Sequence, residues 1–454
     1  MEPLRGEETG AHATTRGPVV SRAVELSTVP PPRAVLEAAE GPRLYWAAPG
    51  EATVVGSGAA AAVTATGADR FETVRTAADD LFATGDVHAG TLAARPRLFG
   101  GFAFHDDHAG APPWVGFPAA RFVLPATQVT YTEDSAWLTV NAAGPDADRE
   151  AVERRLAEAR EHLADLPDPG PVGPPPGVSD RERTTSRAAW RDSVTAATTR
   201  IHAGELRKVV LAQALRTDLD SAVSVPDVLA RLGDTYPDCY RFLVEPTDGP
   251  DEREAGFLGA TPERLVGLRG RTVETGALAG TTGRGDTPEE DEWLARELMD
   301  DAKNRHEHEL VADAIREQLA PFAASVATGE RRVRRLATVQ HLETPITAEL
   351  ERDEHVLTLV KALHPTPAVG GLPPDVALET IRETERFDRG WYAAPVGWFD
   401  AAGYGSFAVA LRSAVVDDDT ATLFAGVGIV GDSDPDREWD EVDLKYRPML
   451  DELE

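Results

Sequence analysis

The sequence predicts an α+β protein with a large hydrophobic core. Strand-like apolar runs and amphipathic helical stretches follow one another along most of the chain. Hydrophobic residues make up 42% of the 454 positions, which is ample for such a core. One segment, PDPGPVGPPPGV at 167–178, can form neither a helix nor a central strand, because proline lacks the amide donor. Length alone would allow about three domains.

In the first part of the chain, residues 1–18 are polar, and we expect them to be disordered. The segment Arg97 to Asp107 is apolar and contains a glycine pair, which predicts a buried strand where backbones approach closely. The remaining patterns predict strands at 43–48, 61–65 and 137–140, and helices at 69–84 and 148–166.

After the proline run the patterns are clearer. Residues 184–204 begin with Thr and Ser caps and end in glycine, which predicts a helix. Residues 288–322 predict one long helix whose acidic first turn suits the helix dipole. We further expect a strand at 206–215, strands at 331–339 and 347–350 with His341 between them, a turn-rich segment at 364–374, strands at 395–399, 407–416 and 422–430, and a final helix at 435–453.

The stretch Phe257 to Gly285 reads as two strands joined by a tight glycine-rich connection. Glu263 follows Pro262 at the end of the first strand, where the proline favours a stop or a bulge. An acid in that place, opposite the small residues of GALAGT, can form the floor of a pocket. The alternative is a surface turn with an incidental glutamate.

Lysine is rare here. The chain has 46 basic residues, of which only Lys208, Lys303, Lys361 and Lys445 are lysines. Unlike arginine, a buried lysine can lose its proton and act as a base. On the predicted strand Lys208 shares an apolar face with Val210 and Ala212, where a charged amine is costly. Lys208 is therefore a candidate base, unless the four lysines are only survivors of a compositional drift.

Two helices carry further acids. Lys303 and Glu307 are four residues apart, and Glu438, Glu441 and Lys445 share a face, so exposed ion pairs are the default interpretation. Carboxylates without Cys or His partners favour a hard cation such as Mg²⁺. Together with a lysine base and a carboxylic acid they are consistent with a lyase, isomerase or hydratase that acts on an anionic substrate.

The overall charge excludes other classes of protein. A net charge of −31 argues against nucleic-acid and anionic-membrane partners and fits a salt-rich cytoplasm, such as that of a halophile. No apolar run approaches the ~18 residues of a membrane span, and the N-terminus lacks a signal-peptide pattern. A single cysteine, Cys239, excludes a disulfide framework. We therefore expect a cytoplasmic protein. No GxGxxG follows a predicted strand, and the sequence shows no P-loop, HExxH or Ser/Cys nucleophile motif.

Eight motifs follow one another in the second part of the chain. They are LRKVVLAQ (206–213), LGATPERL (258–265), ETGALAGT (274–281), DAKNRHEHELV (301–311), VQHLET (339–344), HPTPAVGG (364–371), ERFDRGWYAAPVGW (385–398) and GVGIVGDSDPDREWDEVDLK (426–445). In order and spacing these motifs resemble the chorismate-binding enzymes. The resemblance covers residues 200–450 strongly, and GGFAFHDD at 100–107 is a weaker match.

The resemblance implies one α+β domain of antiparallel sheets packed face to face, with helices outside and the pocket between the sheets. That domain would span 19–454, with a variable half at 19–166, a connector at 167–183 and a motif-bearing catalytic half at 184–454. The proline run would then be a crossing loop. We also expect a monomer that binds chorismate.

Two positions separate the branches of the family. Anthranilate and aminodeoxychorismate synthases typically have Gln where this chain has Lys208, and the latter have a nucleophilic lysine where it has Ala279. The chain therefore resembles the isochorismate synthases, whether of menaquinone or of siderophore synthesis. The alternatives are a salicylate synthase, which also eliminates pyruvate, an anthranilate synthase large subunit, and a non-catalytic binding protein.

The resemblance also implies roles for individual residues. Lys208 would activate a water that attacks C2 of chorismate, and Glu263 would protonate the departing C4 hydroxyl. Glu307 and Glu441 would hold Mg²⁺, with Glu438 in or near that shell. Substrate contacts are implied for Gly280, Thr281, His341, Thr366, Tyr392, Arg412, Gly428 and Lys445. Two residues depart from the family pattern: Gln213 replaces an arginine and Val427 replaces an alanine.

Overall fold

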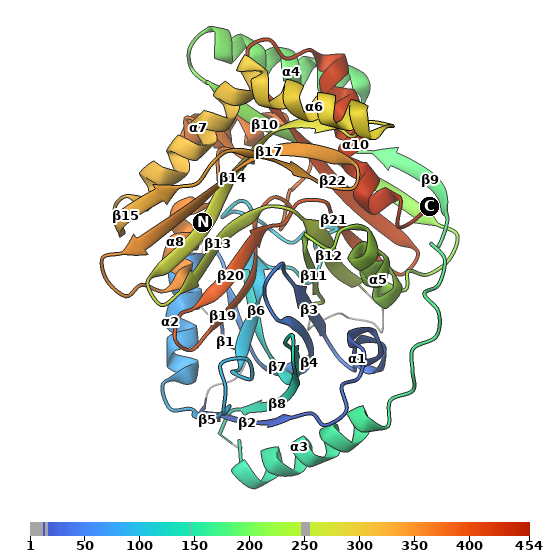
Figure 1. Ribbon diagram of the computed structural model, residues 1–454, viewed down its shortest axis with the longest axis vertical. Coiled ribbons are helices and arrows are strands. Elements are labelled where there is room, and N and C mark those ends of the chain that lie inside the picture. The colour runs from blue at the N-terminus through green and yellow to red at the C-terminus, as the bar shows by residue number, and fades with distance from the viewer. Residues whose placement is uncertain (1–11, 14–16, 146, 247–254) are drawn as a thin grey trace, which may run out of the picture.

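The computed structural model describes residues 12–13, 17–145, 147–246 and 255–454. Its 22 strands form one hydrogen-bonded network that folds into two layers, and β7 belongs to both (Figure 1). The first layer runs in the order β9 (Val178–Arg183), β10 (Lys208–Leu219), β22 (Thr420–Ile429), β21 (Ser413–Asp417), β12 (Ala255–Thr261), β11 (Tyr240–Val244), β3 (Arg43–Ala47), β4 (Thr53–Ala65), β7 (Ala120–Tyr131).

The second layer continues from the other edge of β7. Its order is β6 (Arg97–Phe102), β19 (Pro395–Asp400), β20 (Gly405–Val409), β13 (Arg264–Arg269), β14 (Thr272–Gly283) and β17 (Val339–Leu350), which β15 (Ala323–Thr328) and β16 (Arg332–Arg335) both flank. β8 (Ala136–Ala143), β2 (Val19–Glu25) and β5 (Asp86–His88) extend β7, while β1 (His12–Ala13) lies on β4 and β18 (Gly371–Leu372) on β10. Among the described strands, only β2 and β5 pair in parallel.

Aromatic side chains of the first layer pack in the core against tryptophans from two loops. Phe257 of β12 packs edge-on against Trp114 and Trp391, and Phe424 of β22 stacks on Trp114. Large aromatic rings bury much apolar area each, so this cluster contributes strongly to the cohesion of the two sheets. The predicted α+β fold with sheets face to face is confirmed.

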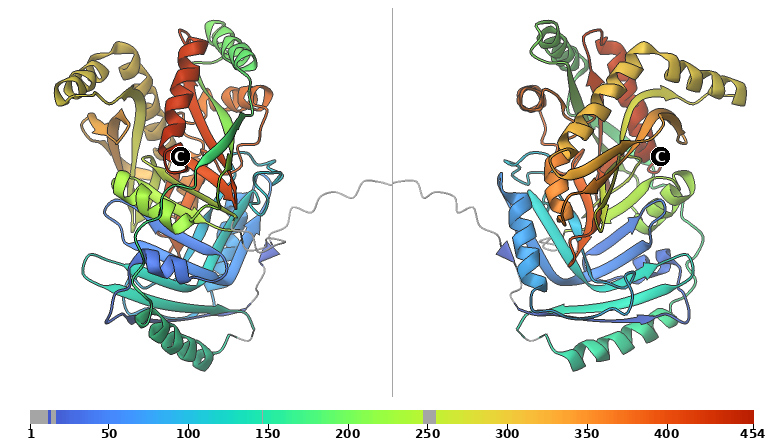
Figure 2. Two further views of the ribbon diagram at one scale, coloured as in Figure 1. Left: turned by 90° about the vertical axis from the view of Figure 1, so that its right-hand side faces the viewer. Right: turned by 60° about the vertical axis from the view of Figure 1, so that its left-hand side comes forward.

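Helices cover the outside of the sheets and the end of the molecule that holds the motifs (Figures 1 and 2). At that end α7 packs on β14, and α10 packs on β22 and α4. The helices are α1 (Pro32–Ala38), α2 (Arg70–Phe82), α3 (Arg149–Ala164), α4 (Arg187–His202), α5 (Val225–Thr235), α6 (Pro288–Asp300), α7 (Ala302–Leu319), α8 (Val356–Leu363), α9 (Pro374–Thr384) and α10 (Pro435–Leu450). None of these helices is both long and apolar enough to cross a membrane.

Most elements lie where the sequence predicted them, including α2, α3, α4, β10 and α10. The proline run has no regular structure before β9 and passes along the side of the molecule from α3 to β9 (Figure 1). Of the N-terminus that we expected to be disordered, residues 1–11 and 14–16 lie outside the described residues, and His12–Ala13 pair with β4. The predicted strand at 97–107 ends at Phe102.

Two predicted elements are divided in the structure. The long helix at 288–322 breaks at Asp301, whose ψ of 122° is extended and whose side chain accepts a hydrogen bond from Asn304 N, so that it caps α7. The stretch 257–285 forms three strands instead of two, because the chain turns both at Pro262–Glu263 and at Gly270, which has a φ of 61°.

Two further predictions about strands were wrong. His341 lies inside β17 and not between two strands. The predicted strand at 407–416 is interrupted between Val409 and Ser413, so four strands replace three near the C-terminus. Arg412 lies in this interruption with a φ of 48°, a left-handed conformation that no regular strand can include.

Candidate active site

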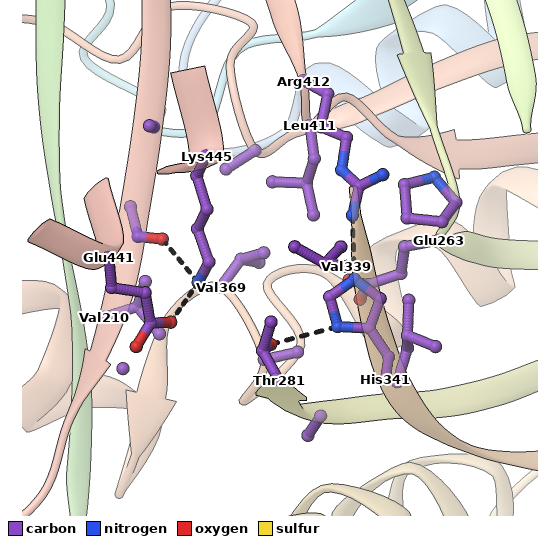
Figure 3. Close-up of a pocket in the computed structure, with 18 of the residues that line it drawn as sticks. Val210, Glu263, Thr281, Val339, His341, Val369, Leu411, Arg412, Glu441 and Lys445 are labelled. Atoms are coloured by element: carbon purple, nitrogen blue, oxygen red, sulfur yellow. Dashed lines mark hydrogen bonds and ion pairs between the residues drawn. The ribbon is translucent and has the colours of Figure 1, made fainter. Parts of the chain in front are cut away.

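A pocket of about 320 Å³ opens between the two layers, below α7 and α10. Its walls come from β10, β14, β17 and β22, from the two helices, and from the loops around 262, 368, 392 and 411. Figure 3 shows Glu441 and Lys445 on one side of it, with Arg412, His341 and Glu263 on the other. Of the predicted site residues it is lined by Lys208, Glu263, Gly280, Thr281, Glu307, His341, Tyr392, Arg412, Gly428, Glu441 and Lys445.

Glu263 occupies the bend between β12 and β13. Its backbone is held on both sides, because its carbonyl accepts from Val409 N at 3.0 Å and its amide donates to Thr261 Oγ1 at 3.3 Å. Thr366, which does not itself line the pocket, donates weakly to Glu263 Oε1 at 3.5 Å. Burial raises the pKa of Glu263 to about 7, against the opposing effects of Lys208, Thr366 and Lys445. A carboxyl of this kind holds its proton near neutral pH and can donate it.

Lys208 is the first residue of β10, and its side chain is only 3% exposed. Its Nζ donates to Glu307 Oε1 at 2.7 Å, a carboxylate partner that the sequence did not predict. Gly428 on β22 makes room for this pair: a Cβ there would meet Lys208 Cε at 2.8 Å and Glu307 Oε1 at 3.1 Å. Any larger residue at 428 would therefore displace the pair.

A second lysine of the pocket lies near the same stretch of β22, at Gly426. Lys445 Nζ donates to Glu441 Oε1 at 2.8 Å and to Gly426 O at 3.1 Å. Both residues lie on α10, one turn apart, as their spacing predicted. Glu307 and Glu441 thus each lie next to a lysine amine.

Arg412, His341 and Thr281 form a hydrogen-bonded chain along the opposite wall (Figure 3). Arg412 Nη2 lies 2.8 Å from His341 Nε2, and because a guanidinium only donates, that nitrogen accepts. The His341 proton is then on Nδ1, 3.0 Å from Thr281 Oγ1. Burial, followed by the charges of Arg412 and Lys445, lowers the pKa of His341 well below its usual value, so the ring is neutral.

Arg412 also has an unused donor. Its Nη1 is buried and has no hydrogen-bond partner among the described residues. A buried donor without a partner costs about 1–3 kcal/mol. The pocket therefore offers a place for an acceptor from a ligand, such as a carboxylate.

The remaining predicted positions shape the wall. Gly280 has a φ of 79°, and its Cα lies beside Asn304 of α7. Tyr392 is buried and stacks on Phe424, with ring centroids 5.4 Å apart, and burial raises the pKa of its hydroxyl. The two family departures lie outside the pocket lining: Val427 alternates with Gly426 and Gly428 on β22 and points to the other face. Gln213 is buried and accepts from Arg183 Nη1 at 3.5 Å.

Some pocket residues were not assigned from the sequence. Arg389 and Asn304 line the pocket and lie inside two of the eight motifs, so the motifs contained the signal although no chemistry was assigned to them. Apart from Leu278 and Ala279, which belong to GALAGT, the apolar part of the wall was not predicted, because its residues come together only through the sheet register. It comprises Val210, Leu278, Val339, Val369, Leu411, Phe424 and Leu444, among others.

The acids in the pocket suit a hard cation by donor type. Glu307 and Glu441 approach the pocket from different helices, and Glu438 is buried on α10 one turn before Glu441. Within the described ranges, no three His, Cys, Asp or Glu side chains come together as a metal site. Two carboxylates fit a Mg²⁺ ion that takes its other ligands from water and substrate oxygens, which is the usual arrangement for this ion.

Comparison with known proteins identifies the family. The sequence profile of the chorismate-binding enzymes matches residues 7–454, nearly the whole chain. The chain belongs to the chorismate-binding enzymes. The predicted family membership is thus confirmed.

Several members of the family are similar over most of their length. The salicylate biosynthesis isochorismate synthase of Pseudomonas aeruginosa is 39% identical over 414 residues, which cover 91% of this chain and 85% of that protein. The isochorismate synthase MenF of Bacillus subtilis is 36% identical over 372 residues, covering 80% and 75%.

Solved structures of the family agree with the fold. The menaquinone-specific isochorismate synthase MenF of Escherichia coli superposes with a TM-score of 0.79 at 27% identity, covering 97% of this chain and 96% of that one. Anthranilate synthase component I of Streptococcus pneumoniae superposes with a TM-score of 0.71 at 21% identity, covering 94% and 92%, which supports the fold alone.

Proposed function

We propose that this chorismate-binding enzyme is an isochorismate synthase. One observation carries the proposal: a single pocket contains a lysine amine and a buried carboxyl whose pKa is raised to about 7. These are the two groups that a water-adding, hydroxyl-expelling isomerase needs. Relatives that are named isochorismate synthase, at 36–39% identity, support the same conclusion.

In the proposed reaction Lys208 Nζ takes a proton from water while the water oxygen bonds to C2 of chorismate. The ring double bond shifts, the C4–O bond breaks, and Glu263 gives its proton to the departing hydroxyl, which leaves as water. One water enters and one leaves, so the product is an isomer of the substrate. Afterwards Lys208 holds a proton from the attacking water and Glu263 is ionised, so a proton must pass from Lys208 to Glu263 before the next turnover.

Chorismate is a dianion, and the chain has a net charge of −31, so cations in the pocket must offset a repulsive field. Arg412 Nη1 and Lys445 are the protein groups that we assign to the substrate carboxylates, with Thr281, His341, Gly280, Gly428 and Tyr392 along the wall and Thr366 behind Glu263. Glu307 and Glu441, with Glu438 beside them, would hold Mg²⁺. When bound, the ion supplies positive charge for a substrate carboxylate.

The product decides between this function and its alternatives. We expect that chorismate and Mg²⁺ at high salt give isochorismate as the accumulating product in chromatography. Salicylate with pyruvate would make the protein a salicylate synthase, and anthranilate on addition of ammonia would make it an anthranilate synthase. Unchanged chorismate would refute the proposal.

We further propose that the product enters menaquinone synthesis, which the similarity to the MenF proteins supports. Deletion of the gene should then abolish menaquinone, whereas loss of a salicylate-type siderophore with normal menaquinone would contradict the assignment.

We also propose a cytoplasmic monomer, for which sedimentation should give the mass of one 48.7 kDa chain.

Glu307→Gln tests the metal ligand. The amide oxygen can still accept from Lys208, but the charge that would attract Mg²⁺ is lost, so the Mg²⁺ concentration for half-maximal activity should rise about 10–100-fold. Calorimetric titration of Mg²⁺ should show the same weakening without turnover. The control is Glu309→Gln, an exposed acid on the same helix that pairs with Arg331. Equal Mg²⁺ affinity in all three proteins would exclude Glu307 as a ligand.

A further inference from the structure

The strand that carries Lys208 has an incomplete edge. On the edge opposite β22, β10 pairs with β18 at Lys208 and Val209, and with β9 from Leu215 onward. No strand among the described residues covers residues 210–214 on this edge. Thr184 pairs with both backbone groups of Ala214 on this edge, since Thr184 N donates to Ala214 O and Ala214 N donates to Thr184 Oγ1. The backbone groups of Val210 and Ala212, which are closer to Lys208, need other partners, because buried backbone groups are almost always paired.

Two side chains supply them. Glu385, directly after α9, accepts from Ala212 N at 2.8 Å, and Arg389 Nη2 donates to Val210 O at 2.8 Å. The same two residues form a bidentate ion pair, with Arg389 Nε and Nη2 at 2.8 and 2.5 Å from the two Glu385 oxygens. Their side chains are 1% and 5% exposed. This buried pair takes the place of the missing stretch of strand.

Arg389 also reaches the loop that supports Glu263. Its Nη1 donates to Val369 O at 2.9 Å. In the turn at 366–370, Val369 N and Gly370 N both donate to Thr366 O, and Thr366 Oγ1 donates to Glu263 Oε1. Gly370 O in turn accepts from Val210 N. One guanidinium thus connects the strand of Lys208 to the turn behind Glu263.

We propose that Arg389, held by Glu385, is a positioning residue that sets the placement of Lys208 relative to Glu263. This inference rests on the proposed function, in which those two groups exchange protons with one substrate. Arg389 lines the pocket, but Nε and both Nη atoms are engaged by protein acceptors, so it acts through the backbone that it holds. Only a planar fork can satisfy these acceptors together, which a lysine ammonium cannot do.

Arg389→Lys is the direct test, with kcat and KM measured separately for chorismate. A misplacement of about 1 Å can cost roughly 10²-fold in rate. We therefore expect kcat to fall about 10²-fold while KM stays within about threefold of the wild type. The control is Arg43→Lys, because Arg43 forms a similarly buried ion pair with Glu245, in which Nε and Nη2 both donate to Oε1, with side chains 9% and 11% exposed, outside the pocket lining. It should lower the melting temperature comparably and leave kcat unchanged.

The other outcomes overturn the inference. A higher KM with unchanged kcat would make Arg389 a substrate ligand. A further outcome is that the Arg389 and Arg43 variants lose kcat in parallel, each in proportion to its unfolded fraction. That result would mean that Arg389 has a purely structural role. If Arg389→Lys does not fold, Glu385→Gln decides: its amide still accepts from Ala212 N, and a normal kcat would contradict the proposal. A wild type that does not convert chorismate would refute the proposed function instead.

Discussion

Replacing Lys208 with alanine is expected to lower kcat by about 10²–10⁴-fold, the usual contribution of a positioned general base. The amine lies 2.7 Å from Glu307 and is 3% exposed, and water alone would have to serve as the base in its absence. Chorismate binding should persist, because we assign the substrate carboxylates to Arg412 and Lys445. Steady-state kinetics and calorimetric binding of chorismate would separate the two effects.

The matched control is Lys361→Ala, which removes an exposed lysine from α8 and should leave kcat unchanged. Lys208→Arg adds a second comparison. It keeps the positive charge beside Glu307 but cannot give up its proton, so it should be as inactive as the alanine variant. Normal turnover in either Lys208 variant would eliminate Lys208 as the base.

Glu263→Gln should bind chorismate and fail to turn it over, with kcat reduced by about 10²–10⁴-fold. Glutamine has nearly the same shape and still accepts from Thr366, but it has no proton to give to the C4 hydroxyl. The control is Glu274→Gln on the adjacent strand β14, where the acid is exposed and paired with Arg264. A fully active Glu263 variant would show that the leaving hydroxyl is protonated by another group.

The pH dependence follows from the same side chain. The acid must be protonated, and its pKa is about 7, so the alkaline limb of the wild-type pH profile should fall about tenfold per pH unit well above 7. The glutamine variant should lose this alkaline limb from its residual activity. A wild-type kcat that stays level to pH 9 would contradict the assignment.

The buried acid should make the folded protein less stable as the pH rises, whereas an ordinary salt-bridged acid makes it more stable. The unfolded carboxyl ionises near 4.5 and the folded one near 7, so the folded protein binds the proton more tightly. Wild-type stability therefore falls between these two pH values and stays reduced above them. Relative to the wild type, Glu263→Gln should gain at most about 3 kcal/mol in free energy of unfolding between pH 4 and 8, which chemical denaturation at the two pH values would measure.

Local sequence signals predicted those helices and strands whose limits depend on their own residues. The caps and periodicity of α4 and α10 and the apolar run of β10 predicted those elements within a few residues. Boundaries were missed where a single residue changes the chain direction. Asp301 divides a helix by capping it with its side chain, and Arg412 divides two strands through a left-handed backbone conformation, and neither feature alters the hydrophobic pattern.

The site shows the same limit. Lys208 and Glu263 stood out because of their residue type and motif, and the structure places both in one pocket. Glu307 stood out as a metal ligand but not as the partner of Lys208, and Arg389 was not assigned. Glu307 reaches Lys208 from a helix 99 residues later, and Arg389 reaches β10 from 179 residues later. Such pairs depend on sheet register and helix packing, which a single sequence does not display.

The segment around Glu263 shows which properties the sequence determines and which only the tertiary structure determines. The sequence specifies an acid after a proline, small residues opposite it, and alanine at 279 in place of the lysine that would imply another nucleophile. Only the tertiary structure decides that this acid is protonated near neutral pH. The pKa rises because burial removes the carboxyl from water, against the opposing effects of Lys208, Thr366 and Lys445, and no local pattern encodes that burial.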